Sequence, residues 1–234
     1  MNDSLVSYSL EGSTAIVRMD DGKANALSAA MIEALLGALD RAEKEAKALV
    51  LTGRPDRFCA GFDLRSMMAG AEAATALLRQ GSDLLMRFYG TPLPLIIAST
   101  GHALAGGALL LLTGDLRFAG DGPFKIGLNE VSIGLPVPIL AMELARDRLV
   151  AAELGKATLM SKIYAPEEAE LAGYLDRVVA REDLLAHATK EAARLGALPR
   201  PAYSATKERL RGATIHKVRS TLEEDLARLL PPSK

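Results

Sequence analysis

Residues 57–65 form the first of three segments whose residue types and spacing could do chemistry. The segment reads Arg-Phe-Cys-Ala-Gly-Phe-Asp-Leu-Arg and follows a wholly apolar run, 48–51, that is typical of a buried strand. Gly61 permits a tight turn, after which backbone N–H groups are free to donate to a negatively charged oxygen. An ordinary turn beside a buried cysteine needs the same residues, so this segment taken alone favours a structural role.

The second segment is 101–114, in which Gly106 and Gly107 open a short apolar helix. Glycine destabilises a helix by about 1 kcal/mol relative to alanine, so the pair needs a reason. One reason is a ligand carbonyl that approaches the backbone where the helix begins and where negative charge is favoured. The other is close packing of the helix against a strand. The pattern does not choose between them.

The third segment, 125–136, carries Glu130 in largely apolar surroundings. Burial raises the pKa of a carboxyl group toward the range in which it can act as a general base. The alternative is a glutamate in a surface loop or one half of a salt bridge.

The other reactive side chains match no known type of site. His102, His187 and His216 have no metal-ligand spacing, and neither HExxH nor GxSxG occurs. The single cysteine, Cys59, cannot form an internal disulfide or supply a metal cage, and we interpret it as a small core residue. The sequence therefore predicts no metal site.

Short apolar runs that end in glycine turns alternate with helical patterns over the first two-thirds of the chain, whereas the rest is almost wholly helical. Strands are expected at residues 5–10, 14–19, 48–51, 93–98 and 175–179. Helices are expected after the N-cap residue Ser28, and at residues 182–196, 200–212 and 215–230. These patterns predict an α/β fold of ββα units in two stacked sheets, with a helical C-terminal region.

Composition and charge exclude several classes of protein. Apolar residues make up 49% of the chain and charged residues 24%, as in ordinary globular proteins. Lys and Arg number 28 against 29 Asp and Glu, a balance that argues against a dedicated nucleic-acid binder. No apolar run is long enough to span a membrane. The N-terminal residues lack the pattern of a secretory signal, so we expect a cytoplasmic protein.

Taken in order, these motifs resemble those of the crotonase superfamily, the enoyl-CoA hydratases and isomerases, over almost the whole chain. Residues 60–64 resemble the family's Ala-Gly-X-Asp-Leu turn, and residues 101–107 resemble its Gly-X-Ala-X-Gly-Gly-Gly helix start. The acidic loop with Glu130 and the run Ala165–Val179, which ends in Tyr-Leu-Asp-Arg-Val-Val, resemble two later family motifs. The resemblance implies a crotonase-like core at residues 1–180 and a helical region at 181–234 within the same functional unit.

The resemblance also implies roles for particular residues. The backbone N–H groups of Phe62 and Gly106 would donate to the oxygen of a thioester, and only the N–H of Phe62, not its side chain, would be used. Lys23, Asp63, Leu64 and Arg65 would line the path of coenzyme A, which is part of an acyl-CoA substrate rather than a separate cofactor. The family further implies a homotrimer or a dimer of trimers.

Leu109 departs from the hydratase pattern, which has a glutamate at this position. Glu130 is then the single acid/base group, and its Gly-Leu-Asn-Glu setting resembles that of the family's Δ3,Δ2-enoyl-CoA isomerases. Moving a double bond needs one group that removes a proton from C2 and returns it at C4, whereas hydration must also activate water. The favoured hypothesis is an isomerase. The alternatives are a hydratase or thioesterase that uses Glu130 alone, and a CoA-thioester-binding pseudoenzyme.

Overall fold

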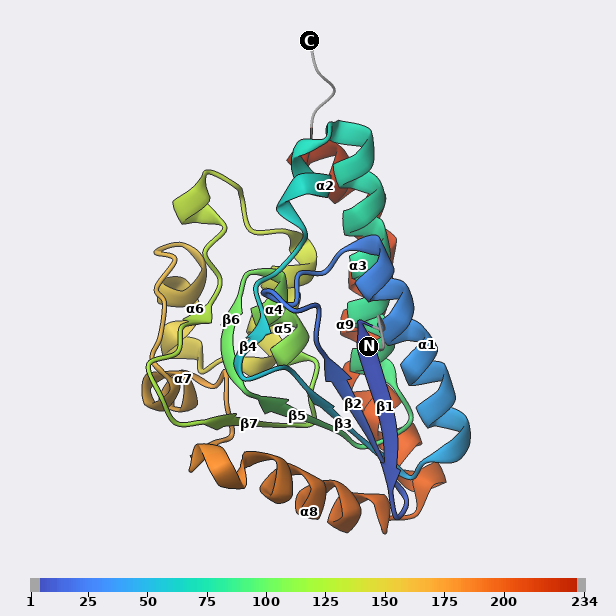
Figure 1. Cartoon of the computed structure of the whole chain (residues 1–234). Helices are drawn as coiled ribbons and strands as arrows, with labels where there is room; N and C mark the ends of the chain where they lie inside the picture. Colours follow the sequence, from blue (N-terminus) through green and yellow to red (C-terminus); the bar gives the residue numbers. More distant parts are fainter. Residues whose placement is uncertain (1–4, 231–234) are drawn as a thin grey trace.

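Two β-sheets organise the chain, which the computed structural model describes from residue 5 to residue 230 (Figure 1). The larger sheet has the strand order β1-β2-β3-β5-β7-β9 and the smaller one the order β4-β6-β8. Among the strand pairs of residues 5–230, β1 and β2 pair antiparallel and the others pair parallel. The strands of the larger sheet are Val6–Glu11, Thr14–Met19, Ala48–Thr52, Leu95–Ser99, Leu116–Gly120 and Arg177–Val179, and those of the smaller sheet are Asp56–Cys59, Gly101–Leu104 and Ile126–Gly127.

Nine α-helices lie within the described residues, and some of them pack against the larger sheet. Their bounds are α1 Ala29–Glu45, α2 Leu64–Met68, α3 Ala71–Gly90, α4 Gly106–Leu112, α5 Ile139–Arg148, α6 Ala151–Thr158, α7 Pro166–Ala172, α8 Leu184–Gly196 and α9 Arg200–Leu229, with short 3-10 helices η1 (Val131–Ile133) and η2 (Arg181–Asp183). The predicted N-cap of α1 is confirmed, because the Ser28 side chain accepts a hydrogen bond from the Met31 N–H.

The residues of β3 are all buried, and the apolar side chains of this strand alternate between two clusters. Leu49 and Leu51 belong to the main core beneath α1 and α3, whereas Val50 packs in a second cluster with Leu184 and Ala188 of α8. A parallel strand with helices on both faces has no side that contacts water.

The chain repeats a strand of the larger sheet, a strand of the smaller sheet and a helical segment. This order holds for β3-β4-α2, β5-β6-α4 and β7-β8-η1, while β1 and β2 both join the larger sheet. The predicted α/β fold of ββα units followed by helices is confirmed, and helix outweighs strand. The division at residue 180 stays a prediction, and the predicted regions extend at both ends beyond the described residues.

The prediction of two helices at 200–212 and 215–230 is wrong, because α9 is one helix of 30 residues. Its buried side chains include Lys207, Arg211, Thr214 and Val218, a stripe that passes Gly212 without a break. Two of these residues are charged, so the buried face has no apolar periodicity that a sequence pattern could follow. The helix packs against α3 and α5.

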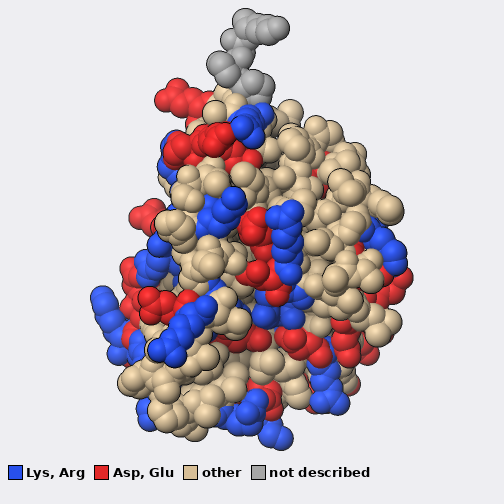
Figure 2. Space-filling view, turned by 180° about the vertical axis from the view of Figure 1, so that it is seen from behind, with Lys and Arg blue, Asp and Glu red and all other residues tan. Residues whose placement is uncertain are grey.

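Charges of both signs are interspersed over the face seen from behind, with no extended surface of one sign (Figure 2). Exposed ion pairs of the described residues include Arg79 with Glu223 and Arg228 with Glu224. Within residues 5–230 no helix combines the length and the apolar character that crossing a membrane requires.

Candidate active site

The turn after β4 presents a backbone N–H that no other part of the described chain uses. Leu27 pairs with Phe62 in a parallel bridge, in which the Leu27 N–H donates to the Gly61 carbonyl at 2.8 Å and the Asp63 N–H donates to the Leu27 carbonyl at 3.2 Å. The N–H of Phe62 therefore points away from Leu27, and it donates to no described residue. Gly61 is buried with φ +98°, a conformation that favours glycine.

Gly106 brings a second free N–H next to the first. It is the first residue of α4, so its N–H has no partner within the helix. A Cβ added to Gly106 would lie 3.3 Å from the nitrogen of Phe62, and one added to Gly61 would lie 3.2 Å from the nitrogen of Gly106. The two amides are thus neighbours, and the absence of a side chain at Gly106 keeps the space between them open.

Ala105, just before this pair, has φ 48° and ψ −122°, which is costly for a residue with a Cβ. Its own N–H donates to the Gly127 carbonyl at 3.0 Å, and its carbonyl accepts from the Leu109 N–H at 3.0 Å. These two bonds hold the strained residue and so fix the direction of the next amide, that of Gly106.

Gly107 serves a second purpose, the close packing of α4 against a strand. A Cβ on this residue would lie 2.0 Å from the carbonyl oxygen of Cys59, so only glycine lets α4 pack against β4. Both explanations of the glycine pair therefore hold, one for each residue.

The ring of Phe62 occupies a slot between two glycines. A Cβ on Gly81, in the middle of α3, would lie 2.1 Å from the ring, and a Cβ on Gly106 would lie 3.0 Å from it. The expectation that only the N–H of Phe62 matters is therefore incomplete, because the ring fixes the position of the turn. The sequence offers one signal of this slot, a glycine inside an otherwise regular helix.

Glu130 lies where the chain leaves β8, and its side chain is 7% exposed. It makes no ion pair with any described residue, and its Oε2 atom has no hydrogen-bond partner among them. Burial raises the pKa of the carboxyl group, while the backbone N–H groups of Glu130 and Asn129 oppose the rise. The alternative of a surface or salt-bridged glutamate is therefore wrong. A buried carboxyl group with a raised pKa and no ion-pair partner is chemically able to act as a base.

The smaller sheet brings these groups together. Phe62 follows β4, Gly106 follows β6 and Glu130 follows β8, and the three strands are parallel neighbours in that order. The carboxyl ends of parallel strands meet at one edge of a sheet, which is where ligands bind in many α/β proteins. Two amide donors and a buried carboxylate at one edge can bind a carbonyl oxygen and move a proton beside it.

The four residues expected along the coenzyme A path flank this edge on two segments. Residues 24–27 run beside residues 60–63, since the Ala60 N–H donates to the Ala24 carbonyl at 3.1 Å. Lys23 and Arg65 are exposed, and the Leu64 side chain is 69% exposed. Asp63 has a structural task as the N-cap of α2, because its carboxylate accepts hydrogen bonds from the N–H and hydroxyl of Ser66, which lower its pKa.

Leu109 and Cys59 supply no polar group to the site. Leu109 is 2% exposed in α4 and packs in the main core. Burial raises the pKa of the Cys59 thiol to about 12, which leaves it unreactive. No group of three or more His, Cys, Asp or Glu within the described residues is arranged to hold a metal ion.

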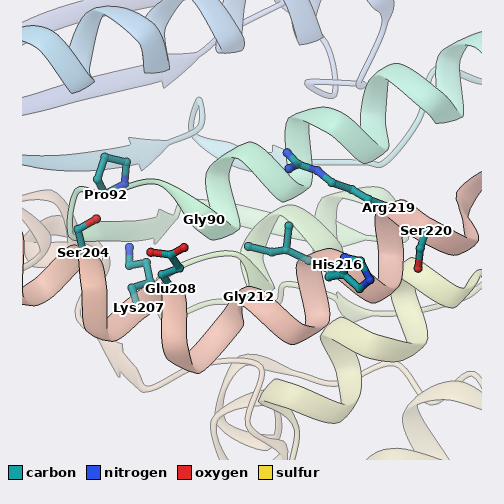
Figure 3. Close-up of a pocket in the computed structure, with 10 residues that line it drawn as sticks. Gly90, Pro92, Ser204, Lys207, Glu208, Gly212, His216, Arg219 and Ser220 are labelled. Atoms are coloured by element: carbon teal, nitrogen blue, oxygen red, sulfur yellow. The ribbon is translucent and has the colours of Figure 1, made fainter.

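A separate cavity of about 700 Å³ lies between the end of α3 and α9 (Figure 3). Gly90, Lys207, Gly212 and His216 are among its lining residues. None of Phe62, Gly106 and Glu130 lines it, so this cavity is distinct from the edge of the smaller sheet.

Comparison with known proteins shows the family to which the chain is similar. The model of the enoyl-CoA hydratase/isomerase family matches residues 9–229. The chain is 29% identical over 227 residues to human mitochondrial enoyl-CoA delta isomerase 1, covering 95% of this chain and 75% of the relative. It is 33% identical over 211 residues to a probable enoyl-CoA hydratase of Rhodobacter capsulatus, covering 89% and 81%.

The fold agrees with that family as well. The crystal structure of an enoyl-CoA hydratase/isomerase family protein from Pseudomonas syringae superposes with a TM-score of 0.94 at 40% identity, covering 97% of this chain and 99% of that one. The chain therefore belongs to the enoyl-CoA hydratase/isomerase family of enzymes.

Proposed function

We propose that the protein is a Δ3,Δ2-enoyl-CoA isomerase, with Glu130 as its single base and the N–H groups of Phe62 and Gly106 as its oxyanion hole. The observation that carries the proposal is the placement of these three groups after β4, β6 and β8, at one edge of the smaller sheet. The two N–H groups and the Oε2 atom of Glu130 lack a partner within the described chain, and a substrate would supply one.

The mechanism follows from the chemistry of the three groups. With the thioester oxygen between the two amides, the Glu130 carboxylate removes a proton from C2 of a 3-enoyl-CoA. The electrons of the C–H bond delocalise over the diene and the thioester oxygen, where the two N–H groups stabilise the negative charge. Removal of one such donor costs about 3 to 4 kcal/mol in comparable sites. Protonated Glu130 then returns the proton at C4, which leaves the double bond between C2 and C3.

Burial of Glu130 suits this role, because a carboxylate with a raised pKa is a stronger base than one in water. The same surroundings favour return of the proton to carbon, since a buried carboxyl group exchanges its proton slowly with solvent.

Leu109 favours isomerisation over hydration. At its position in α4 the hydratase pattern has a second carboxylate, and here the side chain is apolar and buried. Without that carboxylate, only Glu130 remains to orient an attacking water. The human relative named as a delta isomerase supports the same choice.

Hydration is the second candidate, since the Rhodobacter capsulatus relative is named a probable enoyl-CoA hydratase. The deciding experiment compares 3-enoyl-CoA and crotonyl-CoA as substrates of the purified protein under identical conditions. We expect rapid isomerisation of the first and weak or absent hydration of the second. Hydration at a normal enzymatic rate, about 10 per second, without isomerisation would reverse the assignment.

A further inference from the structure

Asn25 is a fully buried polar residue that the mechanism described above does not use. It lies in the loop between β2 and α1, and its exposed fraction is 0%. Its φ of 52° lies in the left-handed region, which asparagine tolerates better than most residues other than glycine. Burying an amide is costly unless its hydrogen bonds are made, so the partners of Asn25 show what it holds in place.

The side-chain NH2 group of Asn25 joins the two sheets. Its Nδ2 atom lies 3.1 Å from three carbonyl oxygens, that of Met19 at the end of β2 and those of Arg57 and Phe58 in β4. An amide group has two N–H donors, so at least one of them is shared between two carbonyls. Because β2 belongs to the larger sheet and β4 to the smaller one, a single side chain fixes the start of the turn that carries Phe62.

Asp21 fixes the orientation of this amide. The Asp21 N–H donates to Oδ1 of Asn25 at 3.0 Å. The Oδ1 atom of Asp21 accepts hydrogen bonds from the N–H groups of Lys23 at 2.7 Å and of Asn25 at 2.9 Å. These bonds close the loop around Asn25 and hold its left-handed conformation. Since its Oδ1 atom is bonded to the loop, the amide presents its donors to β4.

Leu27, two residues after Asn25, bonds to the turn on both sides of Phe62. Its N–H donates to the Gly61 carbonyl at 2.8 Å, and its carbonyl accepts from the Asp63 N–H at 3.2 Å. The position of Asn25 therefore sets where Leu27 meets the turn, and the two bonds of Leu27 set the direction of the Phe62 N–H.

We propose that Asn25 is a positioning residue for the oxyanion hole, because its side-chain amide holds the turn 57–63 so that the Phe62 N–H points at the thioester oxygen. This inference rests on the proposed role of that N–H. Asn25 is buried and makes its bonds within the chain, so it does not touch the substrate. An oxyanion donor acts on the transition state only in the right direction, so loss of the amide should slow the chemical step more than it weakens substrate binding.

The test removes the amide with Asn25→Gly, since glycine adopts a positive φ without strain. We expect kcat to fall about tenfold or more with little change in KM. Asn25→Ser, which keeps one shorter donor, should lose less. The matched control is Thr52→Val, which removes another buried bond, from Oγ1 of Thr52 to the Ala98 carbonyl at 2.9 Å within the larger sheet. This control should leave kcat and KM close to native.

A second readout does not depend on turnover. Native-state amide hydrogen exchange follows the N–H groups of Leu27 and Asp63, whose bonds hold the turn. Relative to the amides of α8 in the same protein, we expect both to exchange about tenfold faster or more in Asn25→Gly than in Thr52→Val. Unchanged exchange, or faster exchange with native kcat, would overturn the inference. If Asn25→Gly does not fold, Asn25→Ser decides by the same two measurements.

Failure of the proposed function is a separate outcome. The oxyanion hole would serve hydration as well as isomerisation, so kcat is measured with crotonyl-CoA if the native protein turns over that substrate instead of 3-enoyl-CoA. Turnover of neither substrate by the native protein would refute the proposed function, while the exchange rates still decide whether Asn25 holds the turn.

Discussion

Gly106 and Gly107 are adjacent in the sequence but meet different neighbours, and this contrast gives a test at the level of single residues. A Cβ at Gly106 would enter the space between the two free amides, 3.0 Å from the Phe62 ring, whereas a Cβ at Gly107 would strike the backbone of Cys59 at 2.0 Å. One methyl group should therefore affect catalysis at the first position and folding at the second.

For Gly106→Ala we expect kcat/KM to fall about 100-fold, with a change of no more than about 1 kcal/mol in the free energy of unfolding. For Gly107→Ala we expect a loss of about 2 to 3 kcal/mol of stability, because backbone must move to admit the methyl group. Steady-state kinetics and urea unfolding of the two variants measure both effects. Full activity of Gly106→Ala would show that the two amides do not bind the thioester oxygen.

Glu130 leads to a second prediction, which concerns how the free energy of unfolding depends on pH. Burial raises the pKa of Glu130 in the folded state. The folded protein is therefore less stable when Glu130 is ionised, at neutral pH, than when it is protonated. Glu130→Gln should therefore be more stable than the native protein at pH 7 to 8, by about 1 to 2 kcal/mol. The gain should vanish below the unfolded-state pKa, where both side chains are neutral. Thermal unfolding across this pH range measures it, and an equal or lower stability of the variant at pH 8 would contradict it.

The residues of the site differ in how far the sequence could reveal them. Gly61, Gly106 and Glu130 have local signatures, because a turn, a helix start and a carboxylate in an apolar run are visible within a few positions. The slot for the Phe62 ring depends on contacts between segments far apart in the chain. A glycine inside the regular helix α3 is their one local signal, and it does not reveal which side chain it faces.

At the scale of elements, buried charges rather than apolar side chains fasten the first half of α9. Lys207 Nζ lies 2.6 Å and Arg211 Nη2 lies 2.9 Å from the carboxylate of Asp115, and the exposed fraction of these cationic side chains is 5% or less. Asp115 also accepts a hydrogen bond from the Leu95 N–H at 2.7 Å. The carboxylate thus links α9 to the start of β5. The same charged residues conceal the buried face of α9 in the sequence, because a pattern of apolar residues is what marks such a face.

Replacement of Asp115 by asparagine should therefore destabilise the protein by about 3 to 5 kcal/mol, because two buried cations lose their shared counter-charge. Glu224→Gln, which removes the exposed partner of Arg228, is the matched control and should change stability by less than about 0.5 kcal/mol. Urea unfolding of both variants checks this prediction. Similar small effects in the two would mean that α9 is held by packing alone.

At the scale of the whole molecule, large apolar side chains remain exposed on α7 and on the turn after α6. They include Leu159 and Met160 after α6 and Leu171 of α7, each at least 73% exposed. Exposed apolar groups of this kind often mark surfaces that other subunits cover. We propose that the protein assembles as a homotrimer or a dimer of trimers, as the family resemblance implies.

Light scattering at micromolar concentration should accordingly give about three or six times the chain mass of 24.8 kDa. Leu171→Lys tests whether α7 lies in the interface, since a charge there should weaken the assembly. Leu210→Lys, on the exposed side of α9, is the comparison, because Leu210 is exposed to a similar degree. A mass near that of a single chain for the native protein would contradict the proposal.

In the proposed mechanism Glu130 alone moves the proton, and a comparison of the native protein with Glu130→Gln tests this role most directly. Glu130→Gln keeps the size of the side chain while removing the base, so the two amides and the substrate-binding surface remain in place. We expect this variant to lose isomerisation of 3-enoyl-CoA by at least about 1,000-fold in kcat and to bind the thioester with nearly native affinity, as measured by calorimetry. Equal turnover by the native protein and Glu130→Gln would contradict any mechanism that has Glu130 as its base.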